Sequence, residues 1–318
     1  MNSSYVVGID VGGQTSKIGV VDARGTVLAQ TVIRTDTYDT VEPYIAELAE
    51  AVNKLIKESG TEGKVRGIGV GAPNGNYYTG TIENAPNLLW GRQRVEFSKL
   101  LSEAMGGLPV ALTNDANAAA VGEMTYGAAR GMKNFIMITL GTGVGSGIVI
   151  NGEVVYGHDG FAGELGHVAA VRNNGRTCNC GKTGCLETYA SATGVARTAR
   201  EWLELSDEPS LLRSLDSIAS KDVYEAAKEG DALALKIFEF TGKILGRSFA
   251  DFIAFSSPEA IVLFGGLARA KEFLNGPIEE AMNANVLPLW RNKVKVVYSQ
   301  LKESDAAILG ASALAWEL

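Results

Sequence analysis

Two stretches of the chain repeat one pattern of short apolar runs separated by glycine turns. The first, residues 5–32, contains the turn Val-Gly-Gly-Gln-Thr-Ser, and the second, residues 134–156, contains Gly-Thr-Gly-Val-Gly. Runs rich in valine and isoleucine between glycine turns are typical of β-strands. The repeat therefore predicts two strand meanders related by an internal duplication, which restricts the chain to folds with two matching halves.

Apolar residues with helical spacing alternate with strand-like runs over the rest of the chain. The expected helices cover residues 43–59, 95–105, 192–205, 220–227, 232–255 and 306–316, and the expected further strands residues 65–70, 109–112 and 260–264. This alternation predicts an α/β fold with parallel strands. A length of 318 residues exceeds most single cores, so we expect a small domain of residues 1–113 and 301–318 and a larger domain of residues 114–300.

Charge and hydropathy exclude two classes of partner. The formal net charge is −7 and no cluster of lysine and arginine stands out, so we expect no general attraction to nucleic acid. The most apolar segment, residues 135–140, is short and is followed by Gly141 and Gly143. The first twenty residues do not begin with charged residues followed by a long apolar run. We therefore expect no membrane span, no secretion signal, and a cytoplasmic protein with reduced thiols.

All three cysteines of the chain, Cys178, Cys180 and Cys185, lie within eight positions. Three thiolates and one imidazole complete a tetrahedral zinc shell, and His167, eleven residues upstream, is the nearest candidate for the fourth ligand. Because such a shell leaves no open position for water, the expected Zn²⁺ is structural. Buried free cysteines and an accidental cluster are the alternatives.

The segment that starts at Asp10 ends the first strand with two glycines, Gly12 and Gly13. Glycine backbone N–H groups can approach a phosphate, and the acid can hold Mg²⁺ through water. A tight hairpin with a capping aspartate is the alternative. A second glycine turn, Gly141-Thr142-Gly143, occurs in the repeat. It favours the phosphate-binding interpretation, in which the two turns hold a triphosphate from opposite sides. The spacing matches neither a P-loop nor the Gly-x-Gly-x-x-Gly fingerprint.

Asp115 follows a strand and precedes an alanine-rich run, which places it in the first turn of a helix. The helix dipole there favours the carboxylate form. An ionised aspartate can accept a proton from a hydroxyl that attacks a phosphoryl group, and a simple N-cap is the alternative role.

Other polar residues are candidates for binding a sugar. If one nitrogen of His167 binds zinc, the other is held in place to read a sugar hydroxyl. Glu164 and Glu187 lie on the same segments, although a solvated surface carboxylate is the common alternative. Gly75 and Asn87 lie in turn-rich stretches that can also be plain loops.

These residues together resemble the ROK family of sugar kinases, which also includes sugar-responsive repressors. The matching motifs are Asp10-Val-Gly-Gly, Gly71-Ala-Pro-Asn-Gly, Asn114-Asp115-Ala-Asn-Ala, Leu140-Gly-Thr-Gly-Val-Gly, Glu164-Leu-Gly-His167, Cys178-x-Cys-Gly-x-x-Gly-Cys-x-Glu187 and Leu263-Phe-Gly-Gly266. The resemblance implies an actin-like (ribonuclease H-like) two-domain ATPase fold, with ATP between the domains and a hexose beside it. It also implies a homo-oligomer, a dimer or a tetramer.

The resemblance assigns roles to residues of this sequence. Asp115 resembles the catalytic base. The implied sugar ligands are Gly75, Asn87, Asn114, Asp115, Glu164, His167 and Glu187, and the implied zinc ligands are His167, Cys178, Cys180 and Cys185. The nucleotide site takes in Asp10, Gly12, Gly13, Gln14, Thr15, Lys17, Gly141, Thr142, Gly143, Gly265 and Gly266. Gln14 departs from the family pattern, which usually has threonine there.

The function implied is transfer of the γ-phosphoryl group of ATP to the 6-hydroxyl of a hexose, with Mg²⁺ near Asp10 and glucose as the leading substrate. N-acetylmannosamine, N-acetylglucosamine, mannose and fructose remain alternatives, because substrate choice depends on small differences in the pocket. A sugar-sensing transcription regulator is the rival from another class. The acidic charge and the first expected strand, which begins at Tyr5 and leaves no room for a helix-turn-helix before it, disfavour that rival.

Overall fold

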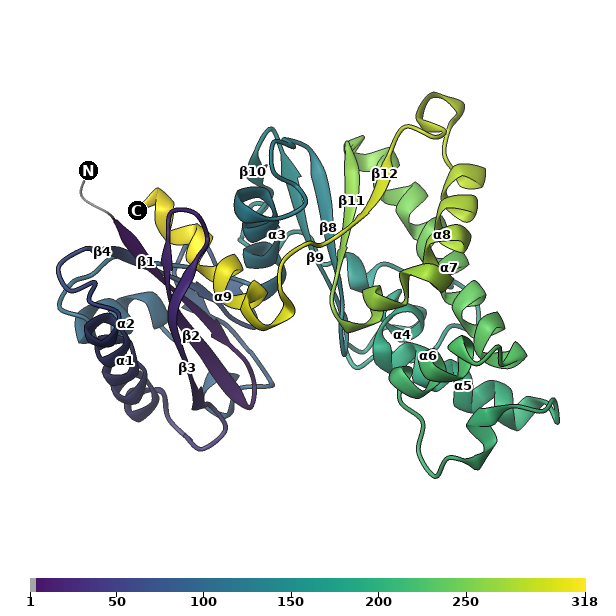
Figure 1. Cartoon of the computed structure of the whole chain (residues 1–318), viewed down its shortest axis with the longest axis horizontal. Coiled ribbons are helices and arrows are strands. Elements are labelled where there is room, and N and C mark those ends of the chain that lie inside the picture. The colour runs from purple at the N-terminus through teal and green to yellow at the C-terminus, as the bar shows by residue number, and fades with distance from the viewer. Residues whose placement is uncertain (1–3) are drawn as a thin grey trace. The chain divides into compact units, whose positions relative to one another are not determined.

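The computed structural model describes residues 4–318 and is drawn in Figure 1. These residues form two compact units. Unit 1 consists of the described residues up to Met132 together with Gly147–Gly163 and Gln300–Leu318, and unit 2 consists of Lys133–Ser146 and Glu164–Ser299. The domain division expected from the sequence stays a prediction, since close packing within a unit does not establish that a segment folds alone.

Unit 1 is built on a five-stranded sheet in the order β3-β2-β1-β4-β7. Its strands are β1 (Tyr5–Val11), β2 (Thr15–Asp22), β3 (Val27–Arg34), β4 (Val65–Gly71) and β7 (Val110–Thr113). The first three strands form the antiparallel meander predicted from the sequence, and β4 and β7 continue the sheet parallel to β1. The carboxyl ends of β1, β4 and β7 consequently meet at one edge, where ligands bind in many open α/β sheets.

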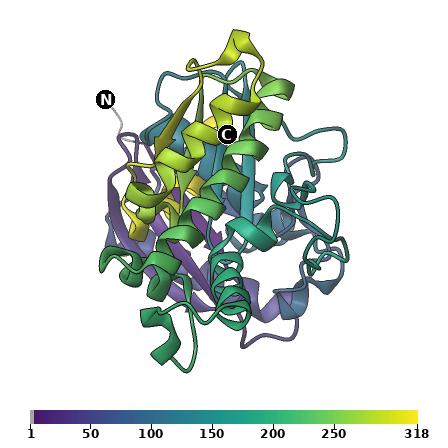
Figure 2. The ribbon, with the colours of Figure 1, turned by 90° about the vertical axis from the view of Figure 1, so that its right-hand side faces the viewer.

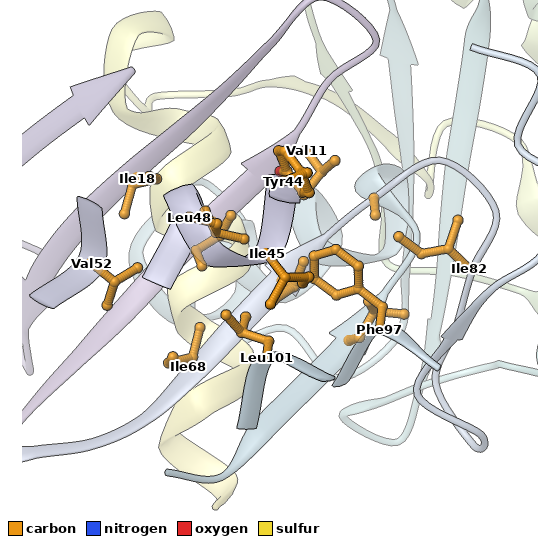
Figure 3. Packing of buried hydrophobic residues seen from close by; sticks show 14 of the residues in the cluster. Val11, Ile18, Tyr44, Ile45, Leu48, Val52, Ile68, Ile82, Phe97 and Leu101 are labelled. Atoms are coloured by element: carbon orange, nitrogen blue, oxygen red, sulfur yellow. The ribbon is translucent and has the colours of Figure 1, made fainter. Parts of the chain in front are cut away.

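Helices cover the two faces of this sheet. They are α1 (Val41–Glu58), α2 (Phe97–Ala104), α3 (Asp115–Tyr126) and α9 (Glu303–Leu314). Val7 and Ile9 of β1 pack with α1 and α2 in the large core cluster, part of which Figure 3 shows around Tyr44 and Phe97. The alternate residue Val6 packs with α9 on the other face. Successive side chains of β1 point to opposite faces of the sheet, so each face offers apolar residues against which a helix layer packs.

Helix α9 lies directly against the sheet. A Cβ added to Gly69 of β4 would lie only 1.9 Å from the carbonyl oxygen of Ala311. Any side chain at this position would therefore push the helix away from the strand. The short elements β5 (Gly75–Asn76), β6 (Thr81–Ile82), η1 (Leu89–Arg92) and η6 (Ala315–Glu317) complete this unit.

The second meander belongs to a sheet in the order β10-β9-β8-β11-β12. Its strands are β8 (Phe135–Leu140), β9 (Val144–Ile150), β10 (Glu153–Val154), β11 (Ala260–Phe264) and β12 (Lys295–Tyr298). Strand β11 pairs in parallel with both β8 and β12. The buried apolar run predicted at residues 260–264 is thus a central strand.

The helices of unit 2 are α4 (Glu187–Ala190), α5 (Ala192–Leu205), α6 (Ser220–Lys228), α7 (Ala232–Ser256) and α8 (Lys271–Asn285). The short helices are η2 (Leu165–His167), η3 (Leu211–Ser214), η4 (Gly266–Ala270) and η5 (Pro288–Trp290). Helices α7 and α8 run side by side, as Figure 2 shows. The sequence patterns did not indicate α8, because Pro277 interrupts its apolar spacing and reads as a helix breaker.

Among residues 4–318, no helix has the length and apolar character needed to cross a membrane.

Candidate active site and metal centre

Asp10 and Asp115 come together at the carboxyl edge of the unit 1 sheet. Asp10 lies at the end of β1, opposite Lys17 of β2 on one side and Gly71 of β4 on the other. A Cβ added to Gly71 would lie 3.6 Å from the Cα of Asp115. The two carboxyl groups are close enough that the charge of Asp115 affects the titration of Asp10.

Asn114, and not Asp115, caps helix α3. The Asn114 side chain accepts a hydrogen bond of 2.7 Å from the backbone N–H of Asn117. The Asp115 carboxylate accepts a backbone N–H bond, 2.8 Å long, from the adjacent Ala116. The alternative in which Asp115 is the N-cap is therefore wrong. Its carboxylate lies at the positive end of the helix dipole and is not occupied by capping.

Both carboxyl groups have raised pKa values. Burial raises the pKa of Asp115, although backbone hydrogen bonds oppose the shift and the residue keeps an exposed surface. Burial, aided by the charge of Asp115 and opposed by Lys17, raises the pKa of Asp10 to about 6. A carboxyl whose pKa is raised toward the working pH is a stronger base than an ordinary aspartate.

The glycine turn between β1 and β2 is closed by a bond of 3.0 Å from the Gly12 N–H to the Thr15 carbonyl. Gly13 packs against the backbone of Asn87, which places this candidate sugar ligand beside the turn. Gln14 uses its carbonyl to accept the Thr35 N–H at 2.9 Å and leaves its side chain exposed. The departure from threonine at this position therefore does not disturb the turn.

Gly75 lies against the segment that precedes Asp115. A Cβ added to Gly75 would lie 2.4 Å from the carbonyl oxygen of Thr113, so no side chain fits there. This close packing against Thr113 is sufficient to explain why residue 75 is a glycine. Its predicted contact with a sugar stays a prediction.

In unit 2, the second glycine turn and the glycine pair after β11 are neighbours. Phe264 pairs with Thr139 at the ends of the parallel strands, and Gly265 then packs against the Leu140 carbonyl. The turn that starts at Gly141 is held by helix α5, because the Ala192 N–H donates to the Gly141 carbonyl at 2.8 Å. The hydroxyl of Thr193 donates to the Thr142 carbonyl at 2.7 Å. Thr193 was missed in the sequence, where only its position beside the Ser191 N-cap was a signal.

Glu187 connects the cysteine segment to this glycine turn. It is the first residue of α4, and its Oε2 accepts the backbone N–H of Val144 at 3.0 Å. Its other oxygen lies 3.7 Å from the Cys178 sulfur. The sequence assigned Glu187 to the sugar and Gly143 to the nucleotide, and the structure places these two residues in contact.

The side chains of His167, Cys178, Cys180 and Cys185 form one cluster in which all candidate ligand atoms lie within 4.8 Å of one another. The Sγ atoms of Cys180 and Cys185 are 3.7 Å apart, as are the Cys178 Sγ and the His167 Nδ1. Two sulfurs bound tetrahedrally to zinc at the usual bond length lie about 3.8 Å apart. The cluster thus fits one tetrahedral metal ion, with the Nε2 of His167 left over.

The three thiols of this cluster differ in how readily they lose a proton. Burial, with further contributions from the neighbouring thiols, raises the pKa of the Cys185 thiol to about 12 and raises that of Cys178. Hydrogen bonds from Lys182 and the other two thiols lower the pKa of the Cys180 thiol although burial opposes this, so Cys180 loses its proton more readily than Cys178 and Cys185. A divalent metal would remove this difference, because it deprotonates a coordinating thiol.

The backbone of the metal segment is held by a buried arginine that the sequence did not indicate. Arg176 contacts Glu201 of α5 in an ion pair of 2.5 Å and donates to the Thr188 carbonyl at 2.8 Å. Its guanidinium lies 4.5 Å from the ring centre of Tyr189. These contacts fix both ends of the segment that carries the cysteines. An arginine just before a cysteine cluster was the only signal in the sequence.

The predicted residues therefore fall into two groups. Unit 1 brings together Asp10, Gly12, Gly13, Gln14, Thr15, Lys17, Gly75, Asn87, Asn114 and Asp115. Unit 2 brings together Gly141, Thr142, Gly143, Glu164, His167, Cys178, Cys180, Cys185, Glu187, Gly265 and Gly266. Candidate phosphate turns and candidate sugar ligands occur in both groups.

Comparison with known proteins places this arrangement in a family. The ROK family model matches residues 6–317. The chain belongs to the ROK family. A glucokinase from Halalkalibacterium halodurans is 39% identical over 98% of this ROK chain and 94% of its own length.

Solved ROK structures share the fold. A ROK family glucokinase from Streptomyces griseus, in complex with glucose and AMPPNP, matches with a TM-score of 0.80 and 32% identity over 99% of this chain and 100% of that chain. A ROK family transcriptional regulator matches with a TM-score of 0.88 and 28% identity over 98% of this chain and 78% of that chain. The actin-like ATPase fold with a metal-binding loop, predicted from the sequence, is confirmed.

Proposed function

We propose that this ROK protein is an ATP-dependent glucose kinase that phosphorylates the 6-hydroxyl of glucose. The observation that carries the proposal concerns Asp115. Because Asn114 caps helix α3, the Asp115 carboxylate is not needed as the cap, and burial makes it more basic. A close relative that is a glucokinase and a ROK glucokinase structure with glucose and AMPPNP support the same activity.

In the proposed reaction, Asp115 accepts the proton of the sugar 6-hydroxyl as that oxygen attacks the γ-phosphorus. The bond from the γ-phosphorus to the bridging oxygen breaks, and ADP leaves. Asp10 at the end of β1 is the proposed residue that would hold Mg²⁺ through water, and the ion would neutralise charge on the phosphates of ATP. The glycine turns are the proposed phosphate contacts, but the N–H groups of Gly12 and Gly141 are not the donors, because each bonds a carbonyl of its own turn.

The proposed glucose ligands are the polar groups around these turns. They are Asn87, Asn114, Glu164, His167 and Glu187, with the backbone at Gly75. His167 would hold the proposed Zn²⁺ through Nδ1, the nitrogen that lies 3.7 Å from the Cys178 Sγ, and Nε2 would then be able to bond a sugar hydroxyl. A metal held by these four residues would have no open position, so it would stiffen the segment that carries Glu187 and would not activate water.

A coupled assay of ADP release over glucose, mannose, fructose, N-acetylmannosamine and N-acetylglucosamine tests the proposal. We expect the highest kcat/KM with glucose, and a higher value with another sugar would replace glucose as the substrate. Asp115→Asn should lower kcat by about 10²–10⁴-fold, the usual loss for a general base. Asp39→Asn, on the exposed surface, is the matched control. A folded Asp115→Asn enzyme with wild-type kcat would contradict the assignment.

A sugar-responsive transcription regulator is the second candidate, favoured by the structural match to a ROK regulator. The net charge of −7 argues against it, because DNA binding needs a basic surface. Sequence-specific DNA binding that responds to sugar, in a protein without phosphoryl transfer, would favour the regulator. We also propose a cytoplasmic homo-oligomer, a dimer or a tetramer, which light scattering after size exclusion would test.

A further inference from the structure

Two loops of unit 1 that lie far apart in the sequence are tied together. One is the turn Asn76–Tyr78, which follows Gly75, and the other is the loop Tyr156–Gly160, which follows β10. The buried Asn76 donates from Nδ2 to the Asp159 carbonyl at 2.7 Å. The Tyr78 hydroxyl donates to the Gly157 carbonyl at 2.9 Å. We call this set of contacts the clamp.

Aromatic stacking adds to the clamp. The rings of Tyr77 and Tyr156 are parallel within 4° with centres 4.0 Å apart, and Tyr78 packs edge-on against Tyr156 at 6.0 Å. A bond of 3.0 Å from the Ala162 N–H to the Tyr156 carbonyl closes the second loop on itself. One internal hydrogen bond and several contacts with the first turn therefore hold this loop. We expect the contacts with the first turn to stabilise its conformation.

Both partners of the clamp lead to residues of the proposed sugar site. The first turn begins at Gly75, which lies against the Thr113 carbonyl just before Asp115. Tyr156 forms a side-chain hydrogen bond with Thr113 itself. The second loop ends at Gly163, and the next residue is Glu164, where unit 2 resumes. The clamp thus joins the strand end that carries the base to the point from which the chain leaves for Glu164 and His167.

We propose that Asn76 and Tyr78 are positioning residues for glucose. By holding the loop Tyr156–Gly160 within unit 1, they fix the place of Gly163, after which the chain continues to Glu164 and His167. This inference rests on the proposed function. The described contacts of the clamp join Asn76, Tyr77 and Tyr78 to residues of the loop Tyr156–Gly160, and none of these is a candidate nucleotide residue. We expect the clamp to affect glucose binding more than ATP binding.

Tyr78→Phe tests the clamp with a minimal change, because it removes one exposed hydroxyl bond and keeps the stacked rings. We expect the KM for glucose, and the dissociation constant for glucose without nucleotide, to rise about fivefold, the effect of one lost neutral hydrogen bond. The KM for ATP and kcat should stay within twofold of wild type. Tyr224→Phe, which removes a 2.7 Å hydroxyl bond to Glu272 between α6 and α8, is the matched control.

Asn76→Asp gives a second variant of nearly the same shape. It keeps the oxygen that accepts the Tyr78 N–H at 3.1 Å and turns a carboxylate oxygen toward the Asp159 carbonyl. We expect a larger loss of glucose affinity than with Tyr78→Phe. Hydrogen exchange of residues 157–168 should be faster in both variants and unchanged in Tyr224→Phe.

The outcomes separate the inference from the proposed function. An active wild-type enzyme whose Tyr78→Phe variant keeps its glucose affinity and its exchange rates would overturn the clamp. Equal losses in the affinities for glucose and ATP would also overturn it, since they would indicate a general structural effect. If the wild type phosphorylates no sugar, the proposed function fails, and the exchange comparison alone decides whether the clamp holds the loop.

Discussion

Replacing Gly143 with alanine tests whether the glycine turn controls the position of Glu187. A Cβ at Gly143 would lie 2.2 Å from the Oε2 of Glu187, the oxygen that accepts the Val144 N–H at 3.0 Å. Non-bonded contacts this short do not occur, so the carboxylate has to retreat by about 1 Å. The clash involves the end of a flexible side chain, so we expect the backbone of the turn to stay in place and the carboxylate to move.

The size of the effect follows from the bond that is lost. A hydrogen bond to a charged group contributes about 1.5–3 kcal/mol, and 1.4 kcal/mol corresponds to a factor of ten. If Glu187 binds a glucose hydroxyl, we expect Gly143→Ala to weaken glucose binding by about 10–100-fold. Calorimetry with glucose alone is the appropriate assay, because it excludes direct interference of the new methyl group with ATP.

Gly141→Ala is the matched control, since it adds a methyl group to the same turn with nothing within 4 Å. We expect its glucose affinity to equal that of the wild type. Wild-type glucose affinity in a folded Gly143→Ala protein would refute the reasoning. An equal loss in both alanine variants would do the same, because it would locate the effect in the turn and not in Glu187.

Two further predictions concern Asp10 and the cysteine cluster. Asp10 has a folded pKa of about 6 against 3.8 for the ordinary group, so the folded protein binds the proton more tightly and loses stability as pH rises through this window. Asp10→Asn should therefore gain about 3 kcal/mol at pH 7.5 in EDTA and almost nothing at pH 4, measured by denaturant unfolding. An equal gain at both pH values would exclude this cause. Elemental analysis should find one Zn²⁺ per chain. Cys178→Ser should lose this Zn²⁺ and unfold at a lower temperature. A metal-free wild-type protein with intact thiols and full activity would contradict a structural zinc site.

The sequence by itself determined the local features of this protein. The repeated glycine turns predicted both meanders, because strand runs and turns depend on neighbouring residues. The cysteine spacing with His167 predicted a cluster that the structure confirms, since three of the four ligands sit on one short segment. The start of α3 at Asp115 followed from the alanine-rich run. In each case the decisive interactions span few residues, so one stretch of sequence contains them.

Only the tertiary structure decided the contacts between distant segments. The release of Asp115 from capping depends on the rotamer of Asn114, which the order of the two residues does not reveal. The contact of Glu187 with Val144 joins positions 43 residues apart, and the clamp joins Asn76 to a loop 83 residues away. Helix α8 forms in spite of Pro277 because it packs along α7. Such contacts depend on how whole elements pack, and their partners cannot be read from local propensity.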